Sequence, residues 1–286
     1  MFRATQRLRP ILAASAGGGA LAGGAWVARC DDGASSSGRW TWPAGAASGS
    51  TLQAAVATAE EGTQFEHRVP CDAVQTGSFG FLIYLPEGYS KGGPWPVVFH
   101  LHGGGENENQ DGFGPLTKDG VNLLSAAGGH GLPAIIESVK HPYVLVSPQC
   151  PQGSRGWGGE PALAACKQLA DQLTSELNVD TSRFYLTGLS MGGSGTWQWA
   201  HAEPERFAAL APICGGWRDQ ATRASAAEKV SHLPHWVAHG ANDKIANVSG
   251  SDKMVEALKG AGAPTVVYKR ESMSCLRASC ASAVLF

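Results

Sequence analysis

The sequence predicts an α/β protein with a mostly parallel β-sheet and helices on both faces of the sheet. From about residue 65 onward, apolar runs alternate with helical patterns, which is the order of elements that builds a parallel sheet. The apolar runs are nearly continuous, as strands buried on both faces should be. A third observation is the hexapeptide Gly-Leu-Ser-Met-Gly-Gly at 188–193. It directly follows such a run and is typical of a sharp turn from a strand into a helix.

Seven apolar runs are expected to contain strands. The first ends at the turn-forming sequence Pro86-Glu87-Gly88, and the third is followed by Pro148. The run at 207–213 is mixed in character, so only its last residues are expected to form a short strand. The other six expected strands are 79–84, 97–101, 143–146, 183–186, 235–238 and 265–268.

Helical patterns lie between these runs. Leucines recur every four residues over 169–177, after a proline that suits the first turn of a helix. Residues 192–200 should form the helix that follows the sharp turn. Apolar residues within 254–258 indicate a short amphipathic helix, which two glycines are expected to end.

The chain is expected to divide into four parts. Residues 1–30 carry four arginines and no acidic residue, and 10–28 are uncharged. A cleaved organellar presequence, a secretory signal, a membrane anchor and plain disorder all stay open for this part. The presequence would place the protein in the mitochondrion or plastid, and the secretory signal would make it a secreted protein. Membrane association is expected only if 10–28 is an uncleaved anchor. Residues 31–64 are predicted to be a disordered linker, 65–270 the folded domain, and 271–286 an atypical tail.

Charge and cysteine content narrow the function. The 286-residue chain has a formal net charge of −2 and a pI near 6.5, so no nucleic-acid partner is expected. The seven cysteines show no zinc-ligand spacing, and most are expected to be reduced thiols, with one or two disulfides left open for an exported protein. His100 and His102 share one face of a strand but lack a third ligand of suitable spacing. We therefore expect that neither a cofactor nor a metal is required.

Ser190 is the candidate nucleophile because it occupies the apex of the sharp turn. Glycines at 188 and 192 permit a strained backbone there and the close passage of the following helix. The N-terminus of that helix adds the positive end of a dipole, and the backbone N–H of Met191 is expected to face the serine oxygen. A chain rich in Gly and Ser produces such patterns by chance, but the position between a strand and a helix argues against chance.

A glycine-rich turn at 102–105, His-Gly-Gly-Gly, directly follows the strand expected at 97–101. Acyl transfer needs two N–H donors aimed at the developing oxyanion, and a glycine turn lets a backbone N–H approach the substrate. Gly104 is therefore the candidate second donor, with Met191 as the first. Weaker candidates for contacts with a substrate are His102 and Trp157, of which Trp157 fits simple packing equally well.

Asp243 is the candidate acid of the same site. It lies in the loop after the strand expected at 235–238, which suits the order of serine, acid and histidine along the chain. Its carboxylate would orient a histidine and stabilise the cationic imidazole. The alternative for Asp243 is a turn or capping residue, which is the more natural interpretation of Asp180.

Together these motifs resemble those of one family, over roughly residues 75–270. The similar segments occur in the family's order at 81–89, 102–106, 147–151, 157, 179–197, 211–216 and 239–243. The chain is similar to α/β-hydrolase esterases described as predicted peptidases or as phospholipase/carboxylesterase-like, with feruloyl esterases and polyhydroxyalkanoate depolymerases as relatives. The resemblance implies the α/β-hydrolase fold and hydrolysis of a small-molecule or polymer-derived carboxylic ester through Ser190 and Asp243.

The chain departs from that family after the last expected strand. The family carries a Gly-His pair in the following loop, whereas this sequence has no histidine after His239. Earlier candidates for the base are His102 beside the glycine-rich turn, His201 about 15 Å along the helix, and His130 in a Gly-rich loop. Without a base the serine hydroxyl stays unactivated, so the chain as written is expected to be nearly inactive.

Three functions therefore stay open. The first is a serine ester hydrolase whose C-terminal segment is truncated or mis-spliced here, which would leave the last strand without its covering helix. The second is a catalytically inactive hydrolase-fold protein that binds or scaffolds. The third is a peptidase or thioesterase that uses the same serine. Substrate choice would depend on the loops at 105–140 and 150–160.

Overall fold

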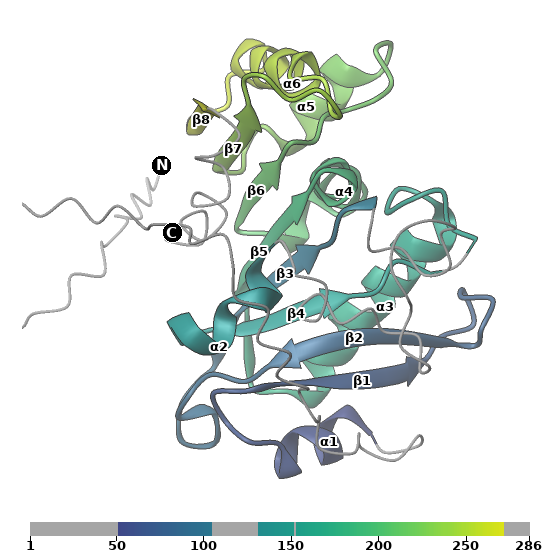
Figure 1. The fold of residues 1–286 in the computed structure, drawn as a ribbon, viewed down its shortest axis with the longest axis vertical. Coiled ribbons are helices and arrows are strands. Elements are labelled where there is room, and N and C mark those ends of the chain that lie inside the picture. Colours follow the sequence, from purple (N-terminus) through teal and green to yellow (C-terminus); the bar gives the residue numbers. More distant parts are fainter. Residues whose placement is uncertain (1–50, 105–130, 152, 272–286) are drawn as a thin grey trace, which may run out of the picture. The chain divides into compact units, whose positions relative to one another are not determined.

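The structure is a computed structural model that describes residues 51–104, 131–151 and 153–271. Within these residues, eight strands form one sheet in the order β1-β2-β4-β3-β5-β6-β7-β8 (Figure 1). β2 pairs antiparallel with both β1 and β4, and the other five neighbouring pairs are parallel. The strands are β1 (Gln64–Pro70), β2 (Ser78–Tyr84), β3 (Trp95–Leu101), β4 (Val144–Pro148), β5 (Val179–Leu189), β6 (Ala209–Ile213), β7 (His235–Gly240) and β8 (Val266–Glu271).

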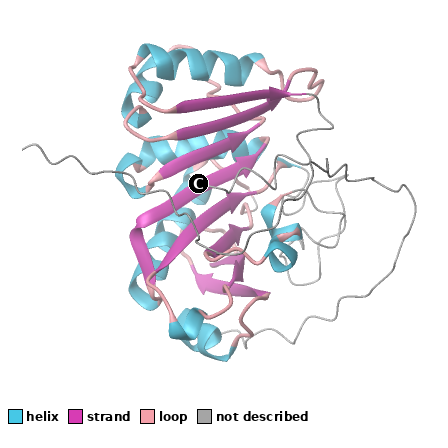
Figure 2. Cartoon of the chain, turned by 90° about the vertical axis from the view of Figure 1, so that its left-hand side faces the viewer, coloured by secondary structure: helices cyan, strands magenta, loops and turns pink. Residues whose placement is uncertain are grey.

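Helices flank the sheet on both sides (Figure 2). The predicted fold class, a mostly parallel sheet with helices on both faces, is confirmed. The α-helices of the described ranges are α1 (Leu52–Thr58), α2 (Ile136–Val139), α3 (Glu160–Glu176), α4 (Met191–Ala202), α5 (Arg223–Val230) and α6 (Ser249–Gly260).

The two faces of the sheet bury different side chains of the same strands, because successive residues of a strand point in opposite directions. In β3, Phe99 belongs to a large apolar core shared with α1, α3, α4, α5 and α6, whereas Val98 belongs to a smaller one shared with α2. In β4, Val146 and Leu145 divide in the same way. Phe99 is fully buried, and its ring packs edge-on against that of Trp199, with 5.0 Å between the ring centroids. Because Trp199 belongs to α4, this helix packs on the middle of the sheet.

Each of the seven apolar runs does contain a strand, and the three expected helices are present. The largest difference is in β5, which begins at Val179 rather than at 183. Asp180 therefore lies inside this strand, where its carboxylate accepts hydrogen bonds from Ser182 and Arg183. These are local structural contacts of the kind that the sequence suggested for this aspartate.

The predicted linker at 31–64 needs a correction at its C-terminal end. Residues 52–58 form α1, whose Leu52 is fully buried, and the Thr51 hydroxyl caps this helix by accepting from the N–H of Ala54 at 3.2 Å. The following strand, β1, pairs along its whole length with β2. Sequence patterns missed both elements because α1 buries only Leu52 and Ala55, and β1 mixes polar and apolar residues at the edge of the sheet.

None of the described helices is long and apolar enough to cross a membrane. Residues 1–50, 105–130 and 272–286 lie outside the described ranges, and so does position 152. The presequence, signal, anchor and disorder interpretations of the first 30 residues therefore stay predictions. The same holds for the atypical tail, of which only the backbone of Glu271 is described.

Candidate active site

The parallel arrangement brings the predicted site residues to one edge of the sheet. β3, β5, β6 and β7 are neighbours that run in the same direction, so their C-terminal ends lie together. Gly104 follows β3, Ser190 follows β5 and Asp243 follows β7. Because neighbouring strands are about 4.8 Å apart, the strand ends that carry Ser190 and Asp243 are separated by about 10 Å. Such a separation leaves room for an imidazole between the two side chains.

Ser190 occupies the strained turn that the sequence predicts. Its φ of 56° and ψ of −109° lie where few residues other than glycine are found. The turn is held by the backbone: the Ser190 N–H donates to the Ile213 carbonyl at 2.8 Å, and the Ser194 N–H donates to the Ser190 carbonyl at 3.0 Å. Strain fixed in this way is common at reactive positions, and here it places a half-buried hydroxyl at the start of α4.

The close approach of α4 to β3 requires glycine at position 192. A Cβ at this position would overlap the Leu101 carbonyl and would lie only 2.7 Å from the His102 carbonyl oxygen. Gly188 is limited in the same way by the backbone of Gly192. The first turn of α4 therefore lies directly against the end of β3.

This approach makes the two predicted oxyanion donors neighbours. A Cβ built on Gly104 would lie 3.9 Å from the Cβ of Met191, which is ordinary van der Waals contact. Met191 is the first residue of the 12-residue helix α4, where the helix dipole is positive. Backbone N–H groups in such a place suit the stabilisation of a negatively charged oxygen beside Ser190.

His102 supports the glycine-rich turn. Its Nδ1 lies 2.7 Å from the Gly103 carbonyl, and its Nε2 accepts from the Cys150 N–H at 2.9 Å. The Gln149 amide nitrogen is also 3.1 Å from Nε2. Since Nε2 is an acceptor, the ring proton sits on Nδ1 and is donated to Gly103. Burial lowers the pKa of His102 to about 4, so the ring is neutral at pH 7 and both of its nitrogens have partners.

Trp157 joins the same turn to α4. Its indole N–H donates to the His102 carbonyl at 3.0 Å, and its ring meets the His102 ring edge-on at 5.0 Å. The Trp157 side chain also packs against Gly195 so closely that a Cβ there would overlap it. The described contacts of Trp157 are those of a buried packing residue, and a contact of either His102 or Trp157 with substrate stays a prediction.

Asp243 has one carboxylate oxygen held by the backbone. Oδ1 accepts from the N–H groups of Ile245 at 2.8 Å and Ala246 at 2.9 Å. Oδ2 lies 3.7 Å from Nε2 of His239, a histidine of β7. The side chain is only 6% exposed. Oδ1 of Asp243 thus fills the turn role that the sequence offered as the alternative for this residue. Oδ2 is the oxygen that faces His239.

Three further histidines of the described residues lie in surroundings different from those of His102, and of these only His201 was a candidate for the base. His100 is buried in β3, and burial lowers its pKa to about 3. His235, at the N-terminal end of β7, stacks on Trp197 at 5.5 Å. His201 lies in the last turn of α4, at the end of the helix opposite Ser190. His130 lies outside the described residues.

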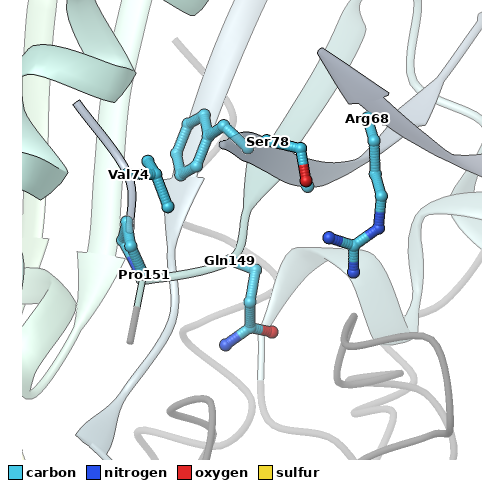
Figure 3. Close-up of a pocket in the computed structure, with 7 residues that line it drawn as sticks. Arg68, Val74, Ser78, Gln149 and Pro151 are labelled. Atoms are coloured by element: carbon cyan, nitrogen blue, oxygen red, sulfur yellow. The ribbon is translucent and has the colours of Figure 1, made fainter. Parts of the chain in front are cut away.

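A small pocket opens at the same edge of the sheet, where β1, β2 and β4 meet. The Arg68 guanidinium, the Ser78 hydroxyl and the Gln149 amide border it (Figure 3). Arg68 also pairs with Glu66 at 3.4 Å. Gln149, which borders this pocket, also contacts His102 at the start of the glycine-rich turn.

Two residues that sequence reasoning missed complete the surroundings of Asp243. Cys214 follows β6 and lies close to both Asp243 and His239. The Ser251 hydroxyl lies 2.7 Å from Nδ1 of His239. The position of Cys214 directly after a strand was the only available signal, and for Ser251, inside α6, there was none.

Three curated proteins are similar to parts of the chain. The bifunctional acetylxylan esterase/xylanase XynS20E of Neocallimastix patriciarum is 33% identical over 107 residues, which are 37% of this chain and 15% of that protein. The probable feruloyl esterase C of Aspergillus terreus is 25% identical over 178 residues, which are 61% of this chain and 58% of that protein. The poly(3-hydroxyalkanoate) depolymerase C of Paucimonas lemoignei is 33% identical over 88 residues, which are 27% of this chain and 21% of that protein. The chain therefore spans less than two thirds of each relative.

A solved structure extends the comparison to about three quarters of the chain. A thermostable esterase of known crystal structure is 28% identical to this chain, with a TM-score of 0.59. The match covers 76% of this chain and 56% of the esterase chain. No family model matches the chain. The predicted α/β-hydrolase fold is confirmed, and so is the relationship to esterases of that fold, among them feruloyl esterases and a polyhydroxyalkanoate depolymerase.

Proposed function

We propose that this α/β-hydrolase chain, a relative of esterases, hydrolyses carboxylic esters through an acyl-enzyme on Ser190. The observation that carries the proposal is the strained serine at the start of α4, with Gly104 beside Met191. Ser190 Oγ attacks the ester carbonyl, and the backbone N–H groups of Met191 and Gly104 stabilise the oxyanion. Collapse expels the alcohol and leaves the acyl group on Ser190, from which water then releases the acid.

The proton of Ser190 needs a base, and Asp243 would orient and stabilise a protonated imidazole in that role. The printed sequence has no histidine after His239, and His102 uses both ring nitrogens within the glycine-rich turn. We therefore propose that the 286-residue chain is impaired. Oxyanion stabilisation and binding alone leave about 10³–10⁴-fold acceleration over the reaction in water.

The proposed substrates are esters of small or polymer-derived carboxylic acids. Acetylxylan esterase, feruloyl esterase and poly(3-hydroxyalkanoate) depolymerase are the names of the curated relatives, which supports oxygen esters of polysaccharide-linked acids or of hydroxyacid polymers. Peptides and thioesters would use the same serine. The sequence observation that favours the catalytically inactive alternative is the lack of a histidine after His239.

The first test is fluorophosphonate labelling of the full 286-residue chain, with Ser190→Ala as the matched control. We expect slow labelling that the control abolishes, because the hydroxyl is well placed but poorly activated. Labelling as fast as that of an intact serine hydrolase would show that a base is present, and the proposed impairment would be wrong. Label retained in Ser190→Ala, or none at all on folded protein, would contradict the acyl-enzyme proposal. Turnover of acetyl, feruloyl and 3-hydroxybutyryl esters then separates the substrate classes.

A further inference from the structure

Three side chains with metal-binding atoms converge at the ends of β6 and β7. Cys214 follows β6, His239 lies near the end of β7, and Asp243 follows β7. One ligand atom from each lies within 4.8 Å of the other two, and no other such group occurs among the residues that the structure describes. Cys214 and His239 are only 6% and 1% exposed. A sulfur, an imidazole nitrogen and a carboxylate oxygen thus share one buried place.

The backbone fixes this convergence. The Cys214 N–H donates to the Ala238 carbonyl at 2.8 Å, which ties the residue after β6 to β7. Cys214 adopts a φ of 53°, in the left-handed region. The two backbone hydrogen bonds to Oδ1 of Asp243 leave Oδ2 as the oxygen nearest to His239, at 3.7 Å.

The spacing suits a tetrahedral ion. Zn–S bonds of about 2.3 Å and Zn–N and Zn–O bonds of about 2.0–2.2 Å place ligand atoms about 3.4–3.6 Å apart in a tetrahedron. The distance between His239 Nε2 and Asp243 Oδ2 is already 3.7 Å, and the outer limit of the group is 4.8 Å. Side-chain movements of about 1 Å or less would bring the three ligand atoms to these distances. The fourth position of the tetrahedron is left for water or another ligand.

The hydrogen bonds around His239 also suit a metal-bound imidazole. Nδ1 lies 2.7 Å from Ser251 Oγ, which lies 3.0 Å from the Gly215 carbonyl. When Ser251 donates to Gly215, Nδ1 can donate to Ser251, and Nε2 then carries the lone pair that can bind an ion. Without an ion, Nε2 is 2.9 Å from the Ala246 carbonyl, which only a proton on Nε2 can satisfy.

We propose that Cys214, His239 and Asp243 form a binding site for a thiophilic divalent cation of the zinc class. On binding, the ring proton of His239 moves from Nε2 to Nδ1, the Ser251 hydroxyl turns to Gly215, and the thiol proton of Cys214 is released to solvent. Occupation also captures the carboxylate of Asp243. The binding does not depend on the proposed esterase activity.

The test is a titration of the reduced, chelator-treated full chain with Co²⁺, which substitutes for Zn²⁺ and reports thiolate ligation by a charge-transfer band. We expect one bound ion with this band and with the visible bands of tetrahedral cobalt, displaced by Zn²⁺. Cys214→Ser should lose the charge-transfer band, and the isosteric Asp243→Asn should weaken binding. Ser251→Ala should weaken it about 10–100-fold by freeing the imidazole. Cys166→Ser, at a buried cysteine of α3, is the control that keeps the band.

Two results would overturn the metal site. One is the absence of a thiolate band with Co²⁺ in excess over folded wild-type protein. The other is a band that persists in Cys214→Ser and Asp243→Asn, which would place the ion at other cysteines of the chain. Circular dichroism of each variant shows whether it is folded.

Fluorophosphonate labelling with and without Zn²⁺ tests the consequence for the serine. Because the proposed function leaves Ser190 without a base for Asp243 to orient, we expect Zn²⁺ to change labelling neither in the wild-type chain nor in Cys214→Ser. If Co²⁺ binds as expected while Ser190 never labels, the metal site stands and the proposed function fails. If Zn²⁺ slows labelling of the wild-type chain but not of Cys214→Ser, Asp243 assists a base for Ser190 and the proposed impairment is wrong.

Discussion

At the scale of single residues, the position of Ser190 depends on the space that Gly192 leaves free. We expect Gly192→Ala to destabilise the protein by about 1–3 kcal/mol, because the added Cβ must displace the Leu101 carbonyl or push α4 away from β3. Labelling of Ser190 should fall as well, since the turn moves with α4. Urea unfolding and fluorophosphonate labelling measure the two effects.

Gly260→Ala is the matched control for this substitution. A Cβ at Gly260, the last residue of α6, meets no atom within 4 Å. Its free energy of unfolding should stay within about 1 kcal/mol of wild type. Equal effects of the two substitutions would contradict the steric argument at position 192.

The candidate site could be predicted where each residue is tied to the end of an apolar run. Ser190, Gly104 and Asp243 follow such runs, and the parallel sheet then brings them to one edge. The surroundings of His102 could not be predicted, because the N–H that binds its Nε2 belongs to Cys150, 48 residues further along the chain. Contacts between distant loops leave no local pattern in a sequence.

At the scale of elements, α1 provides a test of where the folded part begins. We expect Leu52→Ala to lower the free energy of unfolding by about 2–5 kcal/mol, since the side chain is fully buried in the large core. Gln53→Ala, at an exposed position of the same helix, is the control. Chemical denaturation of the full chain measures both. A Leu52→Ala variant as stable as its control would restore the predicted linker up to residue 64.

The elements that sequence patterns found and missed differ in burial. β3, β4 and β6 are buried on both faces over most or all of their length, and they appear in the sequence as continuous apolar runs. β1 is an edge strand with four polar residues among its seven, and α5 buries mainly small alanines, so neither has a clear period. Hydrophobic periodicity detects elements in proportion to the large apolar side chains they bury.

At the scale of the whole molecule, buried histidines should make stability depend on pH. Burial lowers the pKa of His100 to about 3 and that of His102 and His235 to about 4, from an ordinary value of 6.5. Below about pH 6.5 the unfolded chain takes up protons that the folded protein does not yet bind. The free energy of unfolding should therefore fall as the pH drops from about 6.5 towards 4, by up to about 1.4 kcal/mol per pH unit for each histidine.

Urea unfolding at a series of pH values between neutrality and about pH 4.5 measures this slope. His235→Phe keeps a ring for stacking on Trp197 but removes one titrating group, so its slope should be shallower. A free energy of unfolding that stays constant over this range in the wild-type chain would show that the histidines protonate in the folded protein as easily as in the unfolded one.

The order of strands also has a consequence for engineering. Ser190 and Asp243 are held apart by one intervening strand, β6, and not by the length of chain that separates them. The exposed parts of the stretch at 218–232, which carries α5, can therefore be lengthened without changing that separation. A foreign loop could therefore be grafted into this stretch of the scaffold, provided that the residues α5 buries in the large core are kept.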